Sequence, residues 1–149
     1  MKKISHTIVG LSGLWFVLSP HWHFLLNYQK LGNLVLACAV GSIAPDFDLF
    51  WSNRNLKFKE RTLLNSHRGI THHAFLGIFF FLSAFLVSSL VFKAFAIGYF
   101  LHLFADMFSG LGIPYGSYRK RLGFNFYRTG TISEFLVLLM FVSVFLLLS

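Results

Sequence analysis

A histidine and an aspartate lie four residues apart in the stretch GYFLHLFADMFSG, and if this stretch is helical, His102 and Asp106 share one face. Two further carboxylates, Asp46 and Asp48, follow Pro45 in the stretch APDFD. Because proline cannot donate to a helix and disfavours helical geometry in the residue before it, we expect a kink or stop here. Both aspartates would then lie on an irregular turn. Imidazole nitrogens and carboxylate oxygens together form a donor set suited to borderline divalent metals.

A second polar segment, SHRGITHH, directly precedes a long apolar run. It contains His67, Arg68 and His72, and Thr71 is expected to cap the helix that follows. The candidate metal ligands of the whole chain are His6, Asp46, Asp48, His67, His72, His102, Asp106 and Glu134. Guanidinium groups match phosphate in two-point geometry. The candidate substrate-binding residues are therefore Arg68, Arg119 and Arg121.

The composition indicates the elements that must position these residues. The chain has 149 residues, of which 56% are hydrophobic and only 12% are charged. Soluble domains carry about twice that charged fraction, so we expect a membrane protein. The length allows one domain, over residues 1–149. The single Cys38 excludes an intramolecular disulfide.

Five apolar segments approach the roughly 20 residues that a helix needs to cross a bilayer. They lie at about 4–19, 31–51, 71–92, 94–113 and 132–148. We therefore predict an all-α, polytopic membrane protein with about five transmembrane helices. Small residues share a face with the polar ones: Gly10 with His6, Gly98 with His102, and Gly41 near the APDFD stretch. Such faces let transmembrane helices approach closely, which would draw the polar residues inward.

Basic residues predict the orientation of the chain. Of the 13 lysines and arginines, only Lys30 and Lys93 fall on one side of the five predicted spans. The positive-inside rule then gives a cytoplasmic N-terminus in a multi-pass membrane protein. The net charge of +8 is thus mainly a topology signal, with attraction to anionic lipid headgroups as a second role. No nucleic-acid partner is expected.

With this topology, the histidines and acidic residues converge on the cytoplasmic half of the membrane. Unpaired carboxylates in hydrocarbon are costly, and the spans offer few cations to pair with them. A metal centre near the cytoplasmic face would satisfy them. Donors without cysteine favour Zn²⁺, with Mn²⁺ or Fe²⁺ as alternatives, and their number suggests more than one ion.

Taken singly, these residues also allow plainer interpretations. His102 and Asp106 could be a hydrogen-bonded pair that ties two helices together, and the two aspartates of APDFD could cap a helix. His67 could be an interfacial residue and Arg68 an ordinary determinant of topology. The combination of all these groups in one layer favours a metal site over these alternatives.

The ordered motifs H6, APDFD, SHRGITHH, GYFLHLFADMFSGLGIP and RTGTISE together resemble the YdjM-like family of bacterial and archaeal inner-membrane proteins. The resemblance runs from His6 to Glu134 and implies an inner-membrane, metal-dependent hydrolase. The chain departs from the family pattern at His73, where members commonly have serine, and in the stretch YGSYRKRLGF. No role is assigned to His73 or to residues 115–130.

The order of ligands also resembles the zinc-dependent phospholipase C superfamily. That resemblance implies a multinuclear zinc centre in a helical, membrane-embedded phosphoesterase. The implied ligands are His6, Asp46 or Asp48, His67 or His72, His102, Asp106 and Glu134.

The expected function is hydrolysis of a phosphoester, either a phospholipid or a lipid-linked phosphate, by a membrane-bound enzyme. A metal-activated water would be the nucleophile, Asp46 or Asp48 the general base, and Arg68 the phosphate-binding residue. One alternative is a non-catalytic metal-binding or divalent-cation transport protein. Another is a helical membrane scaffold or regulatory partner, in which the polar residues only lock helices together.

Overall fold

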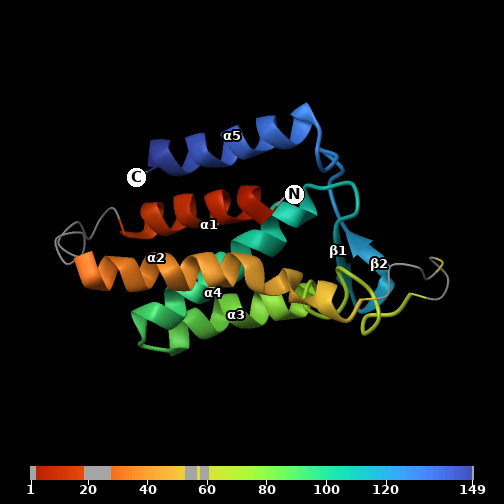
Figure 1. Cartoon of the computed structure of the whole chain (residues 1–149), viewed down its shortest axis with the longest axis horizontal. Helices are drawn as coiled ribbons and strands as arrows, with labels where there is room; N and C mark the ends of the chain where they lie inside the picture. Colours follow the sequence, from red (N-terminus) through yellow and green to blue (C-terminus); the bar gives the residue numbers. More distant parts are fainter. Residues whose placement is uncertain (1–2, 19–27, 53–56, 58–60, 149) are drawn as a thin grey trace.

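The part of the chain that the structure describes forms a bundle of five α-helices with a small β-hairpin at one end (Figure 1). The structure is a computed structural model and describes residues 3–18, 28–52, 57 and 61–148. The helices are α1 (Lys3–Leu18), α2 (Tyr28–Ile43), α3 (Ala74–Leu86), α4 (Leu90–Met107) and α5 (Ile132–Leu148). A 3₁₀ helix, η2 (Ala44–Phe50), continues α2, and the hairpin consists of β1 (Ile113–Tyr115) and β2 (Ser117–Leu122).

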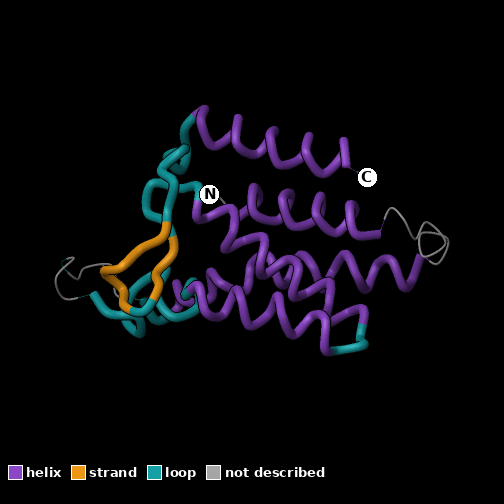
Figure 2. Tube along the Cα trace, turned by 180° about the vertical axis from the view of Figure 1, so that it is seen from behind, coloured by secondary structure: helices purple, strands orange, loops and turns teal. Residues whose placement is uncertain are grey.

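Successive helices run in opposite directions, and the two chain termini lie at opposite ends of the bundle (Figure 1). The start of α1, the end of α2 with η2, the start of α3, the end of α4 and the start of α5 therefore lie at one end. The hairpin and most of the described loops lie at this same end (Figure 2). We call it the site end, because it brings together the segments that carry the predicted ligands.

The helices differ in length from the predicted spans. Among the described residues, two helical segments are long and apolar enough to cross a membrane, Gln29–Phe50 and Leu90–Met107. Helices α1, α3 and α5 are apolar but shorter. Helix α3 has 13 residues, which correspond to about 20 Å, against about 30 Å of bilayer hydrocarbon.

The boundary between the third and fourth predicted spans was wrong. Helix α3 ends at Leu86, and Ser89 caps α4 by accepting a hydrogen bond from the backbone N–H of Phe92 at 3.4 Å. The stretch LVSSLVF is apolar overall, so the hydropathy pattern does not indicate this break. At its other end α4 stops at Met107, whereas the sequence predicted a span that continued to residue 113.

The predicted stop at Pro45 is confirmed. Helix α2 ends at Ile43, and Pro45 lies at the start of η2. Asp46 lies in the first turn of this 3₁₀ helix and Asp48 is fully buried within it. Because a 3₁₀ helix is wound more tightly than an α-helix, the side chains of Asp46 and Asp48 do not continue the face pattern of α2.

The prediction of an all-α chain is incomplete, because the connection between α4 and α5 contains the antiparallel pair β1 and β2. Ile113 is paired with Leu122, and Pro114 with Arg121. Gly116 joins the strands with a φ of +69°, a conformation that side chains with a Cβ rarely adopt. The hairpin packs against the site end and positions Arg121 there.

Close packing of α2 on α4 confirms the predicted role of the small residues. A Cβ on Gly41 would overlap the backbone oxygen of Phe95, and a Cβ on Gly98 would overlap that of Cys38. The two backbones thus approach to a distance that only glycine allows. This contact sets the position of α4, whose last turns carry His102 and Asp106.

Candidate metal centre

Four nitrogen and oxygen atoms from three segments converge at the site end. The Nε2 atoms of His72 and His102 are 3.2 Å apart. Oδ1 of Asp46 lies 3.6 Å and 3.9 Å from these two nitrogens, and Oδ2 of Asp106 lies 3.6 Å and 3.8 Å from them. Donor atoms around a tetrahedral zinc ion, with bonds of about 2.05 Å, are about 3.3 Å apart. We call these four side chains the tetrad. Within it, Asp46, His72 and His102 are close enough together to hold one metal ion, and Oδ2 of Asp106 lies beside both imidazoles.

The second ring nitrogen of each tetrad histidine holds the ring in place. Nδ1 of His102 lies 2.6 Å from the backbone oxygen of Ser42, and Nδ1 of His72 lies 3.1 Å from Oδ2 of Asp48. Because a carbonyl and a carboxylate can only accept, each Nδ1 donates, and in the neutral rings each Nε2 then presents a lone pair to the other. A partner of this kind on the outer nitrogen is typical of histidines that bind metals.

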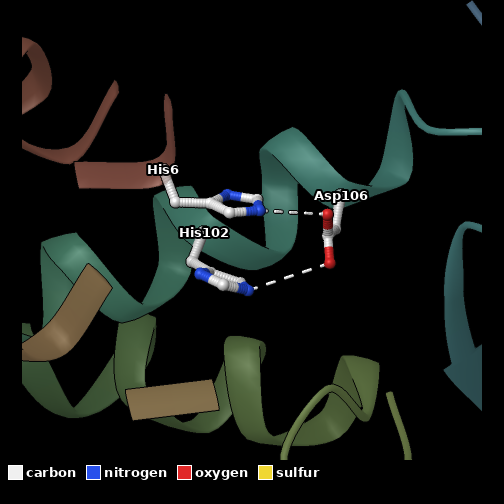
Figure 3. A group of neighbouring side chains, drawn as sticks. All are labelled: His6, His102 and Asp106. Atoms are coloured by element: carbon white, nitrogen blue, oxygen red, sulfur yellow. Dashed lines mark ion pairs between the residues drawn. The ribbon is translucent and has the colours of Figure 1, made fainter. Parts of the chain in front are cut away.

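His6 approaches the tetrad from α1. Its ring stacks on that of His102, with centroids 3.7 Å apart, and its Nε2 lies 3.3 Å from Oδ1 of Asp106 (Figure 3). Nδ1 of His6 is buried and has no hydrogen-bond partner among the described residues. His6, His102 and Asp106 therefore form a second group that could hold a metal ion, beside the group of Asp46, His72 and His102.

Asp48 contacts the Nδ1 atoms of two histidines, His67 and His72. Its Oδ1 lies 2.8 Å from Nδ1 of His67, and its Oδ2 accepts hydrogen bonds from the hydroxyl of Thr71 at 2.8 Å and the backbone N–H of Gly69 at 3.2 Å. Asp48, His67 and His72 are close enough to form a third possible ligand group. The hydrogen bonds nevertheless engage both oxygens of Asp48, which fits an orienting role better than that of a base.

Arg68 connects the loop before α3 to the end of α4. Its backbone has a φ of 57°, and its side chain donates hydrogen bonds to Oδ1 of Asp106 and Oγ of Ser109, each at 2.7 Å. Only 6% of Arg68 is exposed. A buried guanidinium thus lies next to a tetrad carboxylate and compensates part of the negative charge there.

Arg121 and Arg119 differ from Arg68 in their surroundings. Arg121 donates to the backbone oxygens of Leu111, Gly112 and Arg68 at 3.2–3.3 Å and lies over the ring of Tyr118. Burial lowers the pKa of Arg121, yet a guanidinium remains charged at neutral pH. Arg121 therefore joins the hairpin to the turn after α4 and to the loop before α3. This structural role was not predicted. Arg119 is exposed on β2.

Glu134 lies outside the cluster that the three possible ligand groups form together. Its Oε1 accepts a hydrogen bond from Oγ of Ser5 at 2.9 Å, and its Oε2 accepts one from the backbone N–H of Gly130 at 2.6 Å. It belongs to none of the three possible ligand groups among the described residues. Glu134 instead joins the start of α5 to α1. The other seven predicted ligands all lie in the cluster.

Several supporting residues were missed in the sequence. The hydroxyl of Tyr99 donates to the backbone oxygen of Thr71, and Thr71 in turn donates to Asp48, so Thr71 does not cap α3 as expected. His73 has that role, because its side chain accepts a hydrogen bond from the backbone N–H of Phe75. The position of Tyr99, three residues before His102, was a usable signal, since it places both on one face of α4.

A comparison with known proteins identifies the family of the chain. A model of the YdjM inner membrane protein family matches residues 1–148. The chain belongs to this family. Membership in the YdjM family agrees with the resemblance carried by the ordered motifs and indicates that the apolar helices contact the lipid of an inner membrane. No curated protein and no solved structure matches the chain.

Proposed function

We propose that the protein is a membrane-bound, metal-dependent hydrolase that acts on a phosphoester, either a phospholipid or a lipid-linked phosphate. The observation that carries the proposal is the tetrad. Two imidazole nitrogens lie 3.2 Å apart, and one oxygen of Asp46 and one of Asp106 each lie 3.6–3.9 Å from both of them. In a buried place this arrangement is repulsive without a cation among the donor atoms.

A metal ion fits this donor set better than a proton does. A shared proton would bridge only the two nitrogens, whereas a divalent cation in the group of Asp46, His72 and His102 would also bind a carboxylate oxygen. Two imidazoles with two carboxylates and no thiolate suit Zn²⁺, and Mn²⁺ or Fe²⁺ are the alternatives. His6, with its unpartnered buried Nδ1 and its contact to Asp106, offers a place for a second ion.

The residues around the tetrad support hydrolysis. When bound, divalent ions would polarise a phosphoryl oxygen and lower the pKa of a water molecule. The side chain of Asp46 is 11% exposed, against 0–1% for the other three members of the tetrad, so Asp46 is the member that water reaches most easily. Asp46 is the carboxylate that we assign to proton transfer. Asp48 keeps His72 oriented, and Arg68 neutralises part of the charge of Asp106.

We further propose that the five helices all cross the membrane, with the site end at the cytoplasmic face and a cytoplasmic N-terminus. The alternating helix directions support this topology (Figure 1). The basic residues of the described loops also support it, since Arg68 and the hairpin residues Arg119, Lys120 and Arg121 lie at the site end. Lys93 lies near the start of α4, at the opposite end.

Cation transport is a weaker candidate because a cavity at the opposite end of the bundle has an apolar lining among the described residues. This cavity of about 360 Å³ is lined by residues of all five helices, of which Lys93 is the only charged one. A hydrated cation would need polar groups along its path through the membrane. Among the described residues, the three possible ligand groups all lie at the site end, as expected for a site that binds its substrate from one face.

The experiment is phosphate or headgroup release from a panel of phospholipids and prenyl phosphates, measured in detergent with added Zn²⁺ or Mn²⁺. We expect activity in the wild type and its loss in His102→Ala and in Asp106→Asn. The matched control is His73→Asn, because asparagine can still cap α3 while the imidazole beside His72 is removed. Equal activity in the wild type and both site variants would contradict the proposal.

A further inference from the structure

A polar cavity of about 390 Å³ lies beside the tetrad, behind Arg68. Its walls come from three places: the loop before α3, the turn after α4 and the segment before α5. The residues that line it are Arg68, Ser109, Gly110, Leu111, Asn125, Arg128 and Thr129. Two guanidinium groups and no carboxylate are in this lining, so the cavity has the charge to bind an anion.

Arg68 connects this cavity to the tetrad. Its side-chain hydrogen bonds to Asp106 and Ser109 use two of the five N–H donors of a guanidinium, which leaves donors for a ligand in the cavity. Because Arg68 is only 6% exposed, little water would compete with such a ligand. An anion bound to Arg68 would lie close to Asp106, and thus next to the tetrad.

Arg128 supplies the second positive charge, from the segment before α5. This segment is fixed against the end of α4, since the backbone N–H of Gly110 donates to the oxygen of Tyr127 and that of Phe126 donates to the oxygen of Phe108. Asn125 has a left-handed backbone with a φ of 54°, which brings its side chain into the lining. These backbone contacts fix the segment that brings the exposed Arg128 into the lining of the same cavity as Arg68.

Exposed apolar side chains lie in or next to the segments that line this charged cavity. Leu111 in its lining is 65% exposed, and the neighbours of Asn125, Phe124 and Phe126, are 55% and 63% exposed. Exposed phenylalanines beside two arginines form an amphipathic surface. Such a surface suits a ligand that has both an anionic group and a hydrocarbon chain.

We propose that this cavity is a phosphate subsite, in which Arg68 and Arg128 hold the phosphate group of an ester and Phe124 and Phe126 contact its alkyl chain. Guanidinium pairs bind phosphate by two-point hydrogen bonds, and the 2.7 Å contact between Arg68 and Asp106 places the subsite next to the tetrad. The catalytic use of the subsite rests on the proposed function, whereas phosphate binding itself requires no hydrolysis.

The test is therefore a binding measurement on the full-length protein in detergent, with a chelator present so that no turnover occurs. The probes are inorganic phosphate and dodecyl phosphate, titrated by calorimetry. For Arg128→Gln we expect a loss of affinity of about tenfold or more for both probes, because one charge-assisted contact is removed. Arg128→Lys keeps the charge but not the two-point geometry, and should recover part of the affinity.

The matched control is Lys120→Gln, which removes one exposed positive charge of the hairpin outside the cavity and should bind both probes as the wild type does. Tighter binding of dodecyl phosphate than of inorganic phosphate would assign the subsite to a lipid headgroup, and equal binding would assign it to a soluble phosphate ester. Either result supports the subsite. Unchanged affinity in Arg128→Gln, or an equal loss in Lys120→Gln, would overturn it.

Discussion

The Nε2 atoms of His72 and His102 lie 3.2 Å apart, although the two residues belong to different segments of the chain. His72 precedes α3, and His102 lies in the last turns of α4. The partners on the outer nitrogens, Asp48 and the backbone of Ser42, make both inner nitrogens acceptors. This relationship is the basis for the predictions below.

Asp48→Asn should weaken metal binding without removing any member of the tetrad. The asparagine side chain can no longer accept all the hydrogen bonds that reach the two oxygens of Asp48, so the ring of His72 loses its orientation. Loss of such a supporting partner typically costs about 10–100-fold in metal affinity. Competition with a chromogenic chelator measures this affinity. Thr71→Val removes one donor to Asp48 and the 3.3 Å contact of the hydroxyl with Nδ1 of His72, but it keeps the contacts of Asp48 with His67 and His72. It should therefore change the affinity much less; an equal effect would contradict the orienting role.

Gly41→Ala should destabilise the protein by about 1–3 kcal/mol, because the new methyl group would overlap the backbone of Phe95 and push α2 from α4. Gly32→Ala, in the same helix, is the matched control. Nothing lies within 4 Å of a Cβ there, and alanine is favoured in helices by about 1 kcal/mol. Thermal unfolding in detergent should therefore shift down for the first variant and not for the second. Equal shifts would show that the close contact of α2 and α4 is not needed.

Arg121→Lys should destabilise the site end although it preserves the positive charge. The guanidinium holds the backbone oxygens of Leu111, Gly112 and Arg68 at once, and a single ammonium cannot reproduce this fork. We expect a lower unfolding temperature and a weaker affinity for phosphate, since Arg68 loses a backbone partner. Lys120→Gln should leave both quantities unchanged. A wild-type unfolding temperature in Arg121→Lys would mean that the hairpin does not support the loop before α3.

The proposed topology predicts which ends of the bundle a membrane-impermeant thiol reagent reaches. Lys120→Cys at the site end and Ser88→Cys at the opposite end are both exposed positions, and Cys38→Ala removes the buried native thiol. In intact cells Ser88→Cys should be labelled and Lys120→Cys protected until the inner membrane is opened. The reverse pattern would contradict a cytoplasmic site.

Much of this arrangement could be predicted from the sequence because its signals are local. The four-residue spacing of His102 and Asp106, the stop at Pro45 and the small faces of α2 and α4 all follow from helix geometry. The separation of Glu134 from the cluster could not be predicted. Its partners Ser5 and Gly130 depend on how α5 meets α1, which no local pattern encodes.

The hairpin was missed for a related reason. β1 has three residues and β2 six, and polar and basic residues fill four of the six positions of β2, so the alternation of a half-buried strand is weak. The break at Ser88 and Ser89 was missed because apolar residues surround it on both sides. In both places tertiary contacts decide the local structure, and hydropathy alone gave the wrong boundaries.

The central claim is that the tetrad holds a divalent metal ion, and its most direct test is the metal content of the protein purified without chelators. By inductively coupled plasma mass spectrometry we expect at least one Zn²⁺, Mn²⁺ or Fe²⁺ ion per chain in the wild type and in His73→Asn. The double variant His72→Ala/His102→Ala should retain almost none while it stays folded by circular dichroism. A wild type without bound metal, or a folded double variant that retains as much metal as the wild type, would contradict the account.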